Sequence, residues 1–448
     1  MEKLTRKYGF FTAVSMVVGI VIGSGVFKSA GSVLAAAGGD MKLAILAWIV
    51  GGVIMMASAY SFSVASLNLK EITGVVDYIE QIAGKKMGYI VEWFMTYIYY
   101  PSLVSILAWL AGSITSNLFG FADTYNGPSV WLFGVMYFTL TYGLSFFSPV
   151  LAGKWQVSAT VIKLVPLLLI AFVGLIVGMF NGAVVESLTV IAPNSPTGSL
   201  VTAVAVTVFA YDGWIIATSI SSELKNPKRD LSLALVVGSV IVVVAYILFF
   251  LGLSGVVSNG ESLELAGNLD ISVLAAKRLF GNFLGSSVSV LILVSVLGTL
   301  NGVTMANLRG MFTISSKEKG PNPELFTKIS KSDVPYVSGV AAVLASLFWL
   351  GIWFGNFNGL FSGFMDTSVL SIVFLYTFYI LVYMFLVFKV EGINFFSKYV
   401  APIVASLGAL YLVYGAFSSD KKMFLYYSVI VAVILLVGYL TYDRKKAN

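Results

Sequence analysis

Three glycines interrupt the first long apolar stretch of the chain, which reads Val17-Val18-Gly19-Ile20-Val21-Ile22-Gly23-Ser24-Gly25-Val26-Phe27. A glycine inside a helix costs about 0.5–1 kcal/mol relative to alanine, so three of them favour a break. Irregular backbone at membrane depth is tolerated only where protein buries it or where it lines a cavity. The stretch therefore predicts a membrane helix that is broken near its centre.

A broken helix leaves backbone groups of both kinds available. Its second half begins with free N–H groups, and its first half ends with free carbonyl oxygens. Donors and acceptors that lie together near the middle of a bilayer suit a zwitterionic ligand. The stretch therefore points to a carrier of amino acids.

The composition is that of a helical membrane protein. Of the 448 residues, 58% are hydrophobic and 11% are charged, and the mean hydropathy is +0.93. An apolar helix of about 20 residues crosses the hydrocarbon core of a bilayer. Such runs predict twelve transmembrane helices, near 10–33, 42–66, 89–115, 129–148, 153–179, 200–221, 232–257, 281–314, 335–353, 360–388, 398–417 and 423–442. No soluble domain fits between them, so we expect residues 1–448 to form a single transporter domain in the lipid bilayer.

The net charge of +6 sets the orientation of the protein in the membrane. Most of the 27 lysines and arginines fall in segments that are cytoplasmic if the N-terminus is inside. This positive-inside pattern predicts cytoplasmic N- and C-termini in the cell membrane. We expect no nucleic-acid partner.

The chain contains neither cysteine nor histidine. This excludes disulfides, thiol nucleophiles, histidine-based catalysis and the usual zinc sites. We therefore expect no enzyme activity, no metal and no cofactor.

A second break is predicted in the sixth span, at Val208-Phe209-Ala210-Tyr211-Asp212-Gly213-Trp214. An aspartate at the centre of a membrane helix costs about 2.5–3.5 kcal/mol. Ser24 and Gly25 lie 188 residues before Asp212 and Gly213. Breaks at matching places in two halves indicate a transporter built from repeats, and the five spans before the sixth make these repeats inverted. Taken singly, the glycines also fit a helix-packing face and the aspartate a structural partner of a neighbouring helix.

Four motifs resemble the amino acid–polyamine–organocation (APC) superfamily, and most closely its L-amino acid transporter (LAT) family. The family patterns are G-S-G-[IV]-F, F-A-Y-x-G-W, E-x-x-N-P-x-R, and G-x-x-N-G followed by an arginine. They correspond here to Gly23–Phe27, Phe209–Trp214, Glu223–Arg229, and Gly298–Gly302 with Arg309. The motifs occur in the family's order and cover most of the chain.

The resemblance implies an all-α polytopic fold with a five-plus-five inverted-repeat (LeuT-like) core. The first repeat would comprise residues 1–179 and the second 200–388, with two additional helices at 398–442. The first and sixth helices would be broken.

The resemblance also implies a substrate site at the two breaks. Backbone N–H groups of Ser24 and Gly25 would hold the substrate carboxylate, and the carbonyls of Val21, Phe209 and Asp212 would accept from its ammonium. Gly23, Ala210 and Gly213 would complete the site. Phe209 would close it as an aromatic gate, together with Tyr211 and Trp214.

Two departures from the family pattern matter. Ile215 stands where the family often has asparagine, which removes a polar side chain near the site. Without cysteine, the chain has no means of linking to the disulfide-bonded heavy subunit of eukaryotic members. It therefore resembles a bacterial member.

Charged residues inside the spans offer further candidates. Sodium-coupled relatives of this fold hold a cation between spans one, five and eight, and the resemblance places Lys163 there instead. Lys163 would bridge the broken first span and either Ser295 or Thr299, which would make transport sodium-independent. The alternative is that it snorkels or forms a structural pair with a carbonyl. Asp366 is either a proton site or a partner of a neighbouring hydroxyl. Lys28 and Arg309 lie close enough to span ends to snorkel.

The sequence thus predicts a sodium-independent carrier of neutral L-amino acids that works by alternating access. An exchanger that favours small substrates such as alanine and serine is the leading interpretation, because Phe209, Tyr211 and Trp214 crowd the site. A proton-coupled symporter is the close alternative. A channel or an amino acid receptor is the alternative from another class, although no repeated filter sequence is present.

Overall fold

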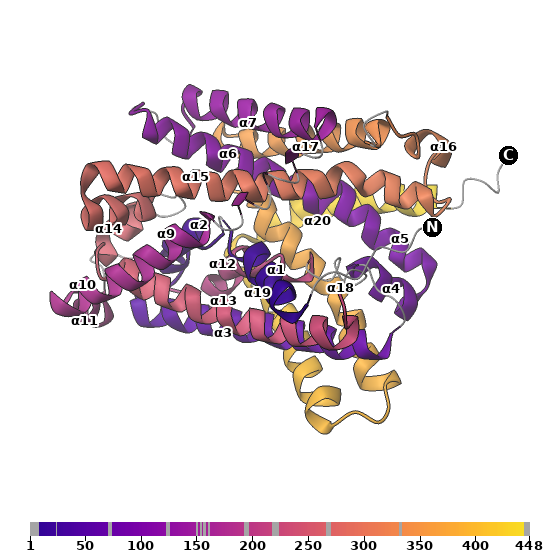
Figure 1. Ribbon diagram of the computed structural model, residues 1–448, viewed down its shortest axis with the longest axis horizontal. Helices are drawn as coiled ribbons and strands as arrows, with labels where there is room; N and C mark the ends of the chain where they lie inside the picture. Colours follow the sequence, from indigo (N-terminus) through magenta and orange to yellow (C-terminus); the bar gives the residue numbers. More distant parts are fainter. Residues whose placement is uncertain are drawn as a thin grey trace. The chain divides into compact units, whose positions relative to one another are not determined.

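A computed structural model describes residues 9–23, 25–69, 74–121, 126–148, 151–152, 155, 158–159, 162–191, 197–216, 224–265, 270–330 and 334–442 (Figure 1). The described elements are helices, with the bounds α1 Phe10–Val21, α2 Gly25–Ala36, α3 Met41–Asn68, α4 Val75–Ala83, α5 Lys85–Phe94, α6 Tyr100–Leu118, α7 Pro128–Phe147, α9 Leu164–Leu169, α10 Leu175–Phe180, α11 Ala183–Thr189, α12 Leu200–Tyr211, α13 Pro227–Ser254, α14 Asn259–Glu264, α15 Asp270–Ser316, α16 Pro323–Phe326, α17 Tyr336–Phe357, α18 Thr367–Lys389, α19 Ala401–Ser419 and α20 Lys421–Thr441. Among the described residues are also three π-helical turns: η1 Met95–Tyr99 between α5 and α6, η2 Ile170–Gly174 between α9 and α10, and η4 Phe396–Val400 before α19.

The helices are long and apolar enough to account for the predicted spans. Within the described ranges, nine helices could each cross a membrane, and the count rises to eleven if each of two bent pairs forms one span. A shorter apolar helix, Leu200–Ile216, lies in the sixth predicted span. The prediction of an all-α polytopic membrane protein is confirmed.

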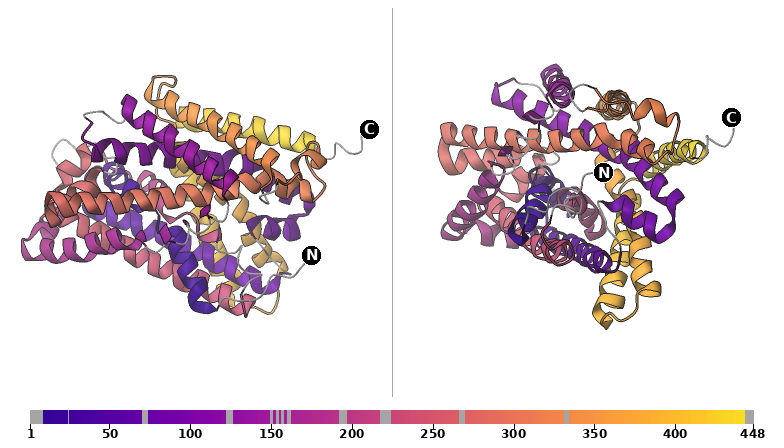
Figure 2. Two further views of the ribbon diagram at one scale, coloured as in Figure 1. Left: turned by 45° about the horizontal axis from the view of Figure 1, so that its top comes forward. Right: turned by 45° about the vertical axis from the view of Figure 1, so that its right-hand side comes forward.

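The eighth span begins at a sharp turn within α15. Gly281 has a φ of 75°, which side-chain-bearing residues rarely adopt, and it separates a short preceding arm from the span itself. The arm folds back so closely that a Cβ atom on Gly285 would lie 2.4 Å from Lys277 Cα. The long arm after the turn is visible as one extended ribbon in both views of Figure 2.

The tenth span starts later than the sequence predicts. We expected it to begin near residue 360, but α18 begins at Thr367 and residues 359–366 are not helical. Gly359 has a φ of 72°, which ends the preceding segment. The Asp366 carboxylate then accepts from the backbone N–H groups of Ser368 and Val369, both at 3.1 Å, and fixes the new helix start.

The chain divides into two compact units. Unit 1 comprises Met1–Ile82, Val161–Ile292 and Val373–Ser419, and unit 2 comprises Ala83–Thr160, Leu293–Ile372 and Asp420–Asn448. Each unit draws on both predicted inverted repeats, 1–179 and 200–388. The repeat boundaries therefore stay a prediction.

Small residues let helices approach closely inside each unit. In unit 1, α3 packs along α13 (Figure 1), and η2 meets α13 where a Cβ on Gly174 would lie 2.3 Å from the Gly252 carbonyl oxygen. In unit 2, α6 meets α7 where a Cβ on Gly112 would lie 2.2 Å from the Val130 carbonyl oxygen. Such contacts replace the hydrophobic driving force that membrane helices lack.

A paired carboxylate and guanidinium tie α14 to the short arm of α15. Arg278 donates to both oxygens of Glu261, at 2.9 and 2.5 Å, and Glu261 also forms a capping box with Ser258. The hydrogen bond from Arg278 lowers the pKa of Glu261 from 4.5 to about 2. The pair therefore stabilises the fold above pH 4.5, and this contribution is lost as the pH falls towards 2.

We expect Glu261→Gln to lower the thermal stability of the purified protein at pH 7 by no more than about 1 kcal/mol, because both side chains are partly exposed. The difference from wild type should vanish between pH 5 and pH 2 in tryptophan-fluorescence melts. A difference that stays constant over this range would contradict the assigned pairing.

Candidate substrate site

The first span is broken at the predicted place. Helix α1 ends at Val21, and Ile22 and Gly23 continue without helical structure before α2 starts at Gly25. The two halves are bent by 50°. Ile22 donates its N–H to the Val18 carbonyl at 2.8 Å, which closes the last turn of α1. Ser24, a predicted carboxylate ligand, lies outside the described residues.

The sixth span is also broken at the predicted place. Helix α12 ends at Tyr211, Asp212 is extended, and Gly213 has a φ of 97°. Trp214 opens a short 3₁₀ turn that is closed by a 3.0 Å bond from Ile216 N–H to the Gly213 carbonyl. Only glycine adopts the Gly213 conformation at little cost, so the local sequence determines this break.

The two breaks lie against each other within unit 1. A Cβ atom on Gly25 would lie 2.7 Å from Ala210 Cα and 2.9 Å from the Phe209 carbonyl oxygen. A Cβ on Gly213 would lie 3.2 Å from Ile20 Cγ2. The structure thus brings together the start of α2, the end of α1 and the end of α12.

Tyr246 joins the two broken helices and was not predicted from the sequence. Its hydroxyl on α13 lies 2.8 Å from the Val21 carbonyl oxygen and 3.0 Å from the Ala210 carbonyl oxygen, and its single hydrogen is shared between these two acceptors. The available signal was a tyrosine in the middle of an apolar span, since a buried tyrosine hydroxyl usually finds a partner. The Val21 carbonyl, a predicted acceptor for the substrate ammonium, therefore already receives the Tyr246 hydroxyl and keeps one further lone pair.

We expect Tyr246→Phe to slow amino acid uptake about tenfold or more, because it removes the one hydrogen that two buried carbonyls share, and such a loss costs about 1–3 kcal/mol. Initial uptake rates in proteoliposomes measure the effect. Tyr414→Phe is the matched control, since Tyr414 is exposed on α19 and its change should leave uptake intact. Equal rates for the two variants would contradict a role of Tyr246 at the breaks.

Aromatic side chains enclose the end of α12. The Tyr211 hydroxyl donates to the Trp48 carbonyl at 2.9 Å, and its ring packs against those of Trp48 and Tyr246. Trp214 is fully buried and donates its indole N–H to the Tyr376 hydroxyl at 3.3 Å. Tyr211 and Trp214 are thus held in packed clusters, and their gating roles stay predictions.

The prediction that Lys28 snorkels to a span end is wrong. Its side chain is 6% exposed, and its ammonium nitrogen lies 4.6 Å from the centre of the Phe209 ring. Its ring partner, Phe209, lies in the helix whose end meets the start of α2. Arg309, the other residue expected to snorkel, is exposed.

Lys163 is buried, at 2% exposed, and directly precedes α9 in unit 1. Its proposed partners lie on α15 in unit 2, where the Thr299 hydroxyl donates to the Ser295 carbonyl at 3.0 Å. The bridge between Lys163 and Ser295 or Thr299 therefore stays a prediction.

Asp366 is a helix cap and a partner of the Ser368 hydroxyl, in addition to its two backbone bonds. Of the two roles considered for this acid, the structure shows the hydroxyl partner. Among the described residues, histidine, cysteine, aspartate and glutamate form no group of three that could hold a metal.

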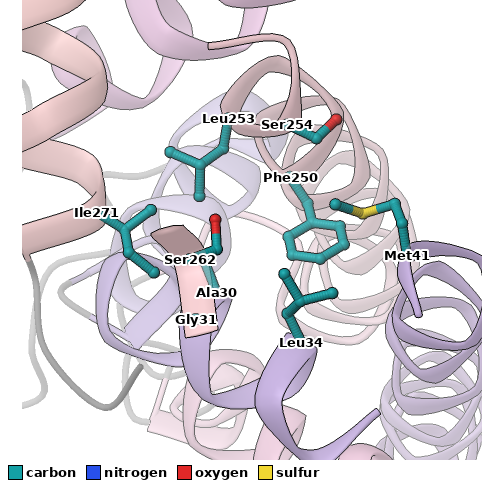
Figure 3. Close-up of a pocket in the computed structure, with 9 residues that line it drawn as sticks. All are labelled: Ala30, Gly31, Leu34, Met41, Phe250, Leu253, Ser254, Ser262 and Ile271. Carbon is teal, nitrogen blue, oxygen red and sulfur yellow. The ribbon is translucent and has the colours of Figure 1, made fainter. Parts of the chain in front are cut away.

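A small pocket lies farther along α2 and is distinct from the breaks (Figure 3). It lies between α2, α13, α14 and the start of α15, and Ser254 and Ser262 supply its only side-chain oxygens. Its lining residues are Ala30, Gly31, Leu34, Met41, Phe250, Leu253, Ser254, Ser262 and Ile271. It holds no charged group for a zwitterion, so the breaks remain the candidate substrate site.

A polytopic helical membrane protein with two broken helices that meet at one place has the architecture of a secondary carrier. The chain belongs to the amino acid permease family, because the sequence model of that family matches residues 8–439. This confirms the resemblance to the APC superfamily.

Three similar proteins are transporters or exchangers by name. The serine/threonine exchanger SteT of Bacillus subtilis is 28% identical over 381 residues, which are 85% of this chain and 82% of SteT. The putrescine transporter PotE of Haemophilus influenzae is 26% identical over 419 residues, which are 90% of this chain and 91% of PotE. The human cystine/glutamate transporter is 25% identical over 328 residues, which are 73% of this chain and 64% of that protein. The chain is thus a membrane-spanning amino acid transporter with an exchanger among its relatives.

Proposed function

We propose that the protein is a sodium-independent exchanger of neutral L-amino acids that favours small substrates such as alanine and serine. The observation that carries the proposal is the contact between the two breaks, where Gly25 meets Phe209 and Ala210. The name of the similar serine/threonine exchanger agrees with both the exchange mode and the small polar substrates.

The substrate would lie across the two breaks. The N–H groups of Ser24 and Gly25 would hold the carboxylate, which the positive end of α2 favours because this helix begins at Gly25. The carbonyls of Val21, Phe209 and Asp212 would accept from the ammonium. Gly23, Ala210 and Gly213 would let the substrate approach the backbone.

The aromatic surroundings favour a short substrate side chain. Phe209 is 8% exposed, and Tyr211 and Trp214, which follow it in the chain, are buried. Ile215 is buried and apolar, so it offers no hydrogen bond to a long polar side chain. Phe209 would close the site, and the ring would turn aside when the substrate enters.

Counterflow separates exchange from its alternatives. Proteoliposomes loaded with alanine should take up labelled serine at least tenfold faster than empty ones, with no dependence on a sodium or pH gradient. Uptake into empty vesicles driven by a pH gradient would instead identify a proton symporter, and flux that does not saturate would identify a channel. A panel with glutamate, cystine and putrescine tests the substrates named for the relatives.

The chain offers a direct test of orientation. Because it contains no cysteine, single cysteines introduced near either end can be labelled from one side of the membrane without a background signal. We propose that both termini are cytoplasmic in the cell membrane, so labelling of intact cells by an impermeant reagent should fail at both positions.

A further inference from the structure

Lys28 is a buried cation that the proposed function does not use. Its side chain is 6% exposed and its ammonium lies over the Phe209 ring. A charge inside a membrane protein is costly, and such charges concentrate where ions or substrates bind. Lys28 is therefore a candidate for a binding role.

The position of Lys28 on α2 directs its ammonium to the break. Lys28 follows Gly25 by three residues, so the two lie on one face of the helix. Side chains on a helix usually lean towards its N-terminus, and for Lys28 this direction is towards the turn that starts at Gly25. Gly25 touches the backbone of Phe209 and Ala210, and the ring beneath the ammonium belongs to this same Phe209.

An anion at this place interacts with two positive groups. The first is the N-terminus of α2, with its available N–H groups and the positive end of the helix dipole. The second is the Lys28 ammonium, whose charge acts strongly because buried surroundings screen it little. The Phe209 ring holds the ammonium beside this place through a cation–π contact. A carboxylate fits, because its two oxygens can accept from an ammonium and a backbone N–H together.

We propose that the Lys28 ammonium binds a carboxylate of the transported amino acid. This inference rests on the proposed function, because it concerns the same site. The carboxylate is either the one on the α-carbon, which every substrate carries, or that of an acidic side chain. In the second case the substrates extend to glutamate and aspartate.

Lys28→Met distinguishes the two sources when reconstituted full-length protein is assayed with alanine and with glutamate. Binding of the α-carboxylate predicts that KM rises at least about tenfold for every transported substrate. Binding of a side-chain carboxylate predicts that wild type carries glutamate and that only the KM for glutamate rises. Lys42→Met is the control, because Lys42 is exposed on α3. Unchanged KM values for both substrates in Lys28→Met would overturn the inference.

If the α-carboxylate is the ligand, competition by alaninamide, which lacks this carboxylate, distinguishes a lysine that binds substrate from one that only supports the fold. Alanine should compete for uptake far better than alaninamide in wild type, and this preference should fall at least about tenfold in Lys28→Met. A lysine that only supports the fold would weaken both competitors equally, which would overturn binding of the α-carboxylate. If Lys28→Met is not recovered folded, the same assays are made with Lys28→Arg, because arginine keeps the positive charge but displaces it. If wild type takes up no amino acid at all, the proposed function itself has failed.

Discussion

Gly25→Ala is expected to abolish amino acid uptake while leaving the protein in the membrane. The added Cβ would lie 2.7 Å from Ala210 Cα and 2.9 Å from the Phe209 carbonyl oxygen, so it would push against backbone on both sides. Neither atom belongs to a flexible side chain that could turn away, and overpacking of this kind costs about 1–3 kcal/mol. The strain falls directly on the contact between the two breaks. We expect the initial rate of alanine uptake in proteoliposomes to fall at least a hundredfold.

Two other glycines serve as controls for Gly25→Ala. Gly351 lies within α17, and a Cβ there would meet nothing within 4 Å, so Gly351→Ala should leave uptake unchanged and stabilise the helix by up to about 1 kcal/mol. Gly51 packs against the Thr207 side chain, where a Cβ would lie 2.1 Å from the hydroxyl oxygen. Gly51→Ala should therefore lower the melting temperature but keep the KM for alanine. Wild-type uptake by Gly25→Ala would show that the breaks do not form the site.

The breaks could be predicted from the sequence because their causes are local. Gly23 and Gly25 in the first span and the pair Asp212-Gly213 in the sixth disfavour helix, and α1 and α12 end just before them, although Gly19 lies within α1. The start of α18 was less predictable. The segment before it is apolar and reads as helix, and its true start depends on the turn at Gly359 and on the Asp366 cap.

Tyr246 and Lys28 show why the rest of the site could not be predicted. Each residue acts through a partner more than 100 positions away, and nothing near either residue identifies that partner. Tyr246 reaches Val21 only because α13 packs against α1, and Lys28 lies over Phe209 only because α2 packs against α12. A lysine near the end of an apolar stretch usually snorkels, so the sequence does not indicate that Lys28 is buried. Only the packing of the helices shows it.

Lys163→Ala is expected to lower alanine uptake at least tenfold and to leave a residual rate that rises with sodium. Lys163 is 2% exposed in the fifth predicted span, so its ammonium must be satisfied inside the protein. We propose that this charge stands in for the sodium ion that other carriers of this fold require. On this proposal, removal of the lysine leaves the hydroxyl of the predicted bridge, Ser295 or Thr299, without a cation, and sodium then binds weakly in its place. Uptake measured in sodium and in choline buffers tests both parts of this expectation.

Two further variants separate the charge of Lys163 from its shape, and two more identify its partner. Lys163→Arg keeps the charge and should retain sodium independence, whereas Lys163→Met keeps much of the length and should behave like Lys163→Ala. Ser295→Ala and Thr299→Val each remove one hydroxyl of the predicted bridge. Loss of the hydroxyl that is the true partner should slow uptake, and in a double variant this effect should not add to that of Lys163→Ala. If Lys163→Ala takes up alanine at the wild-type rate and remains indifferent to sodium, the lysine is structural, and the sodium independence of this carrier must have another source.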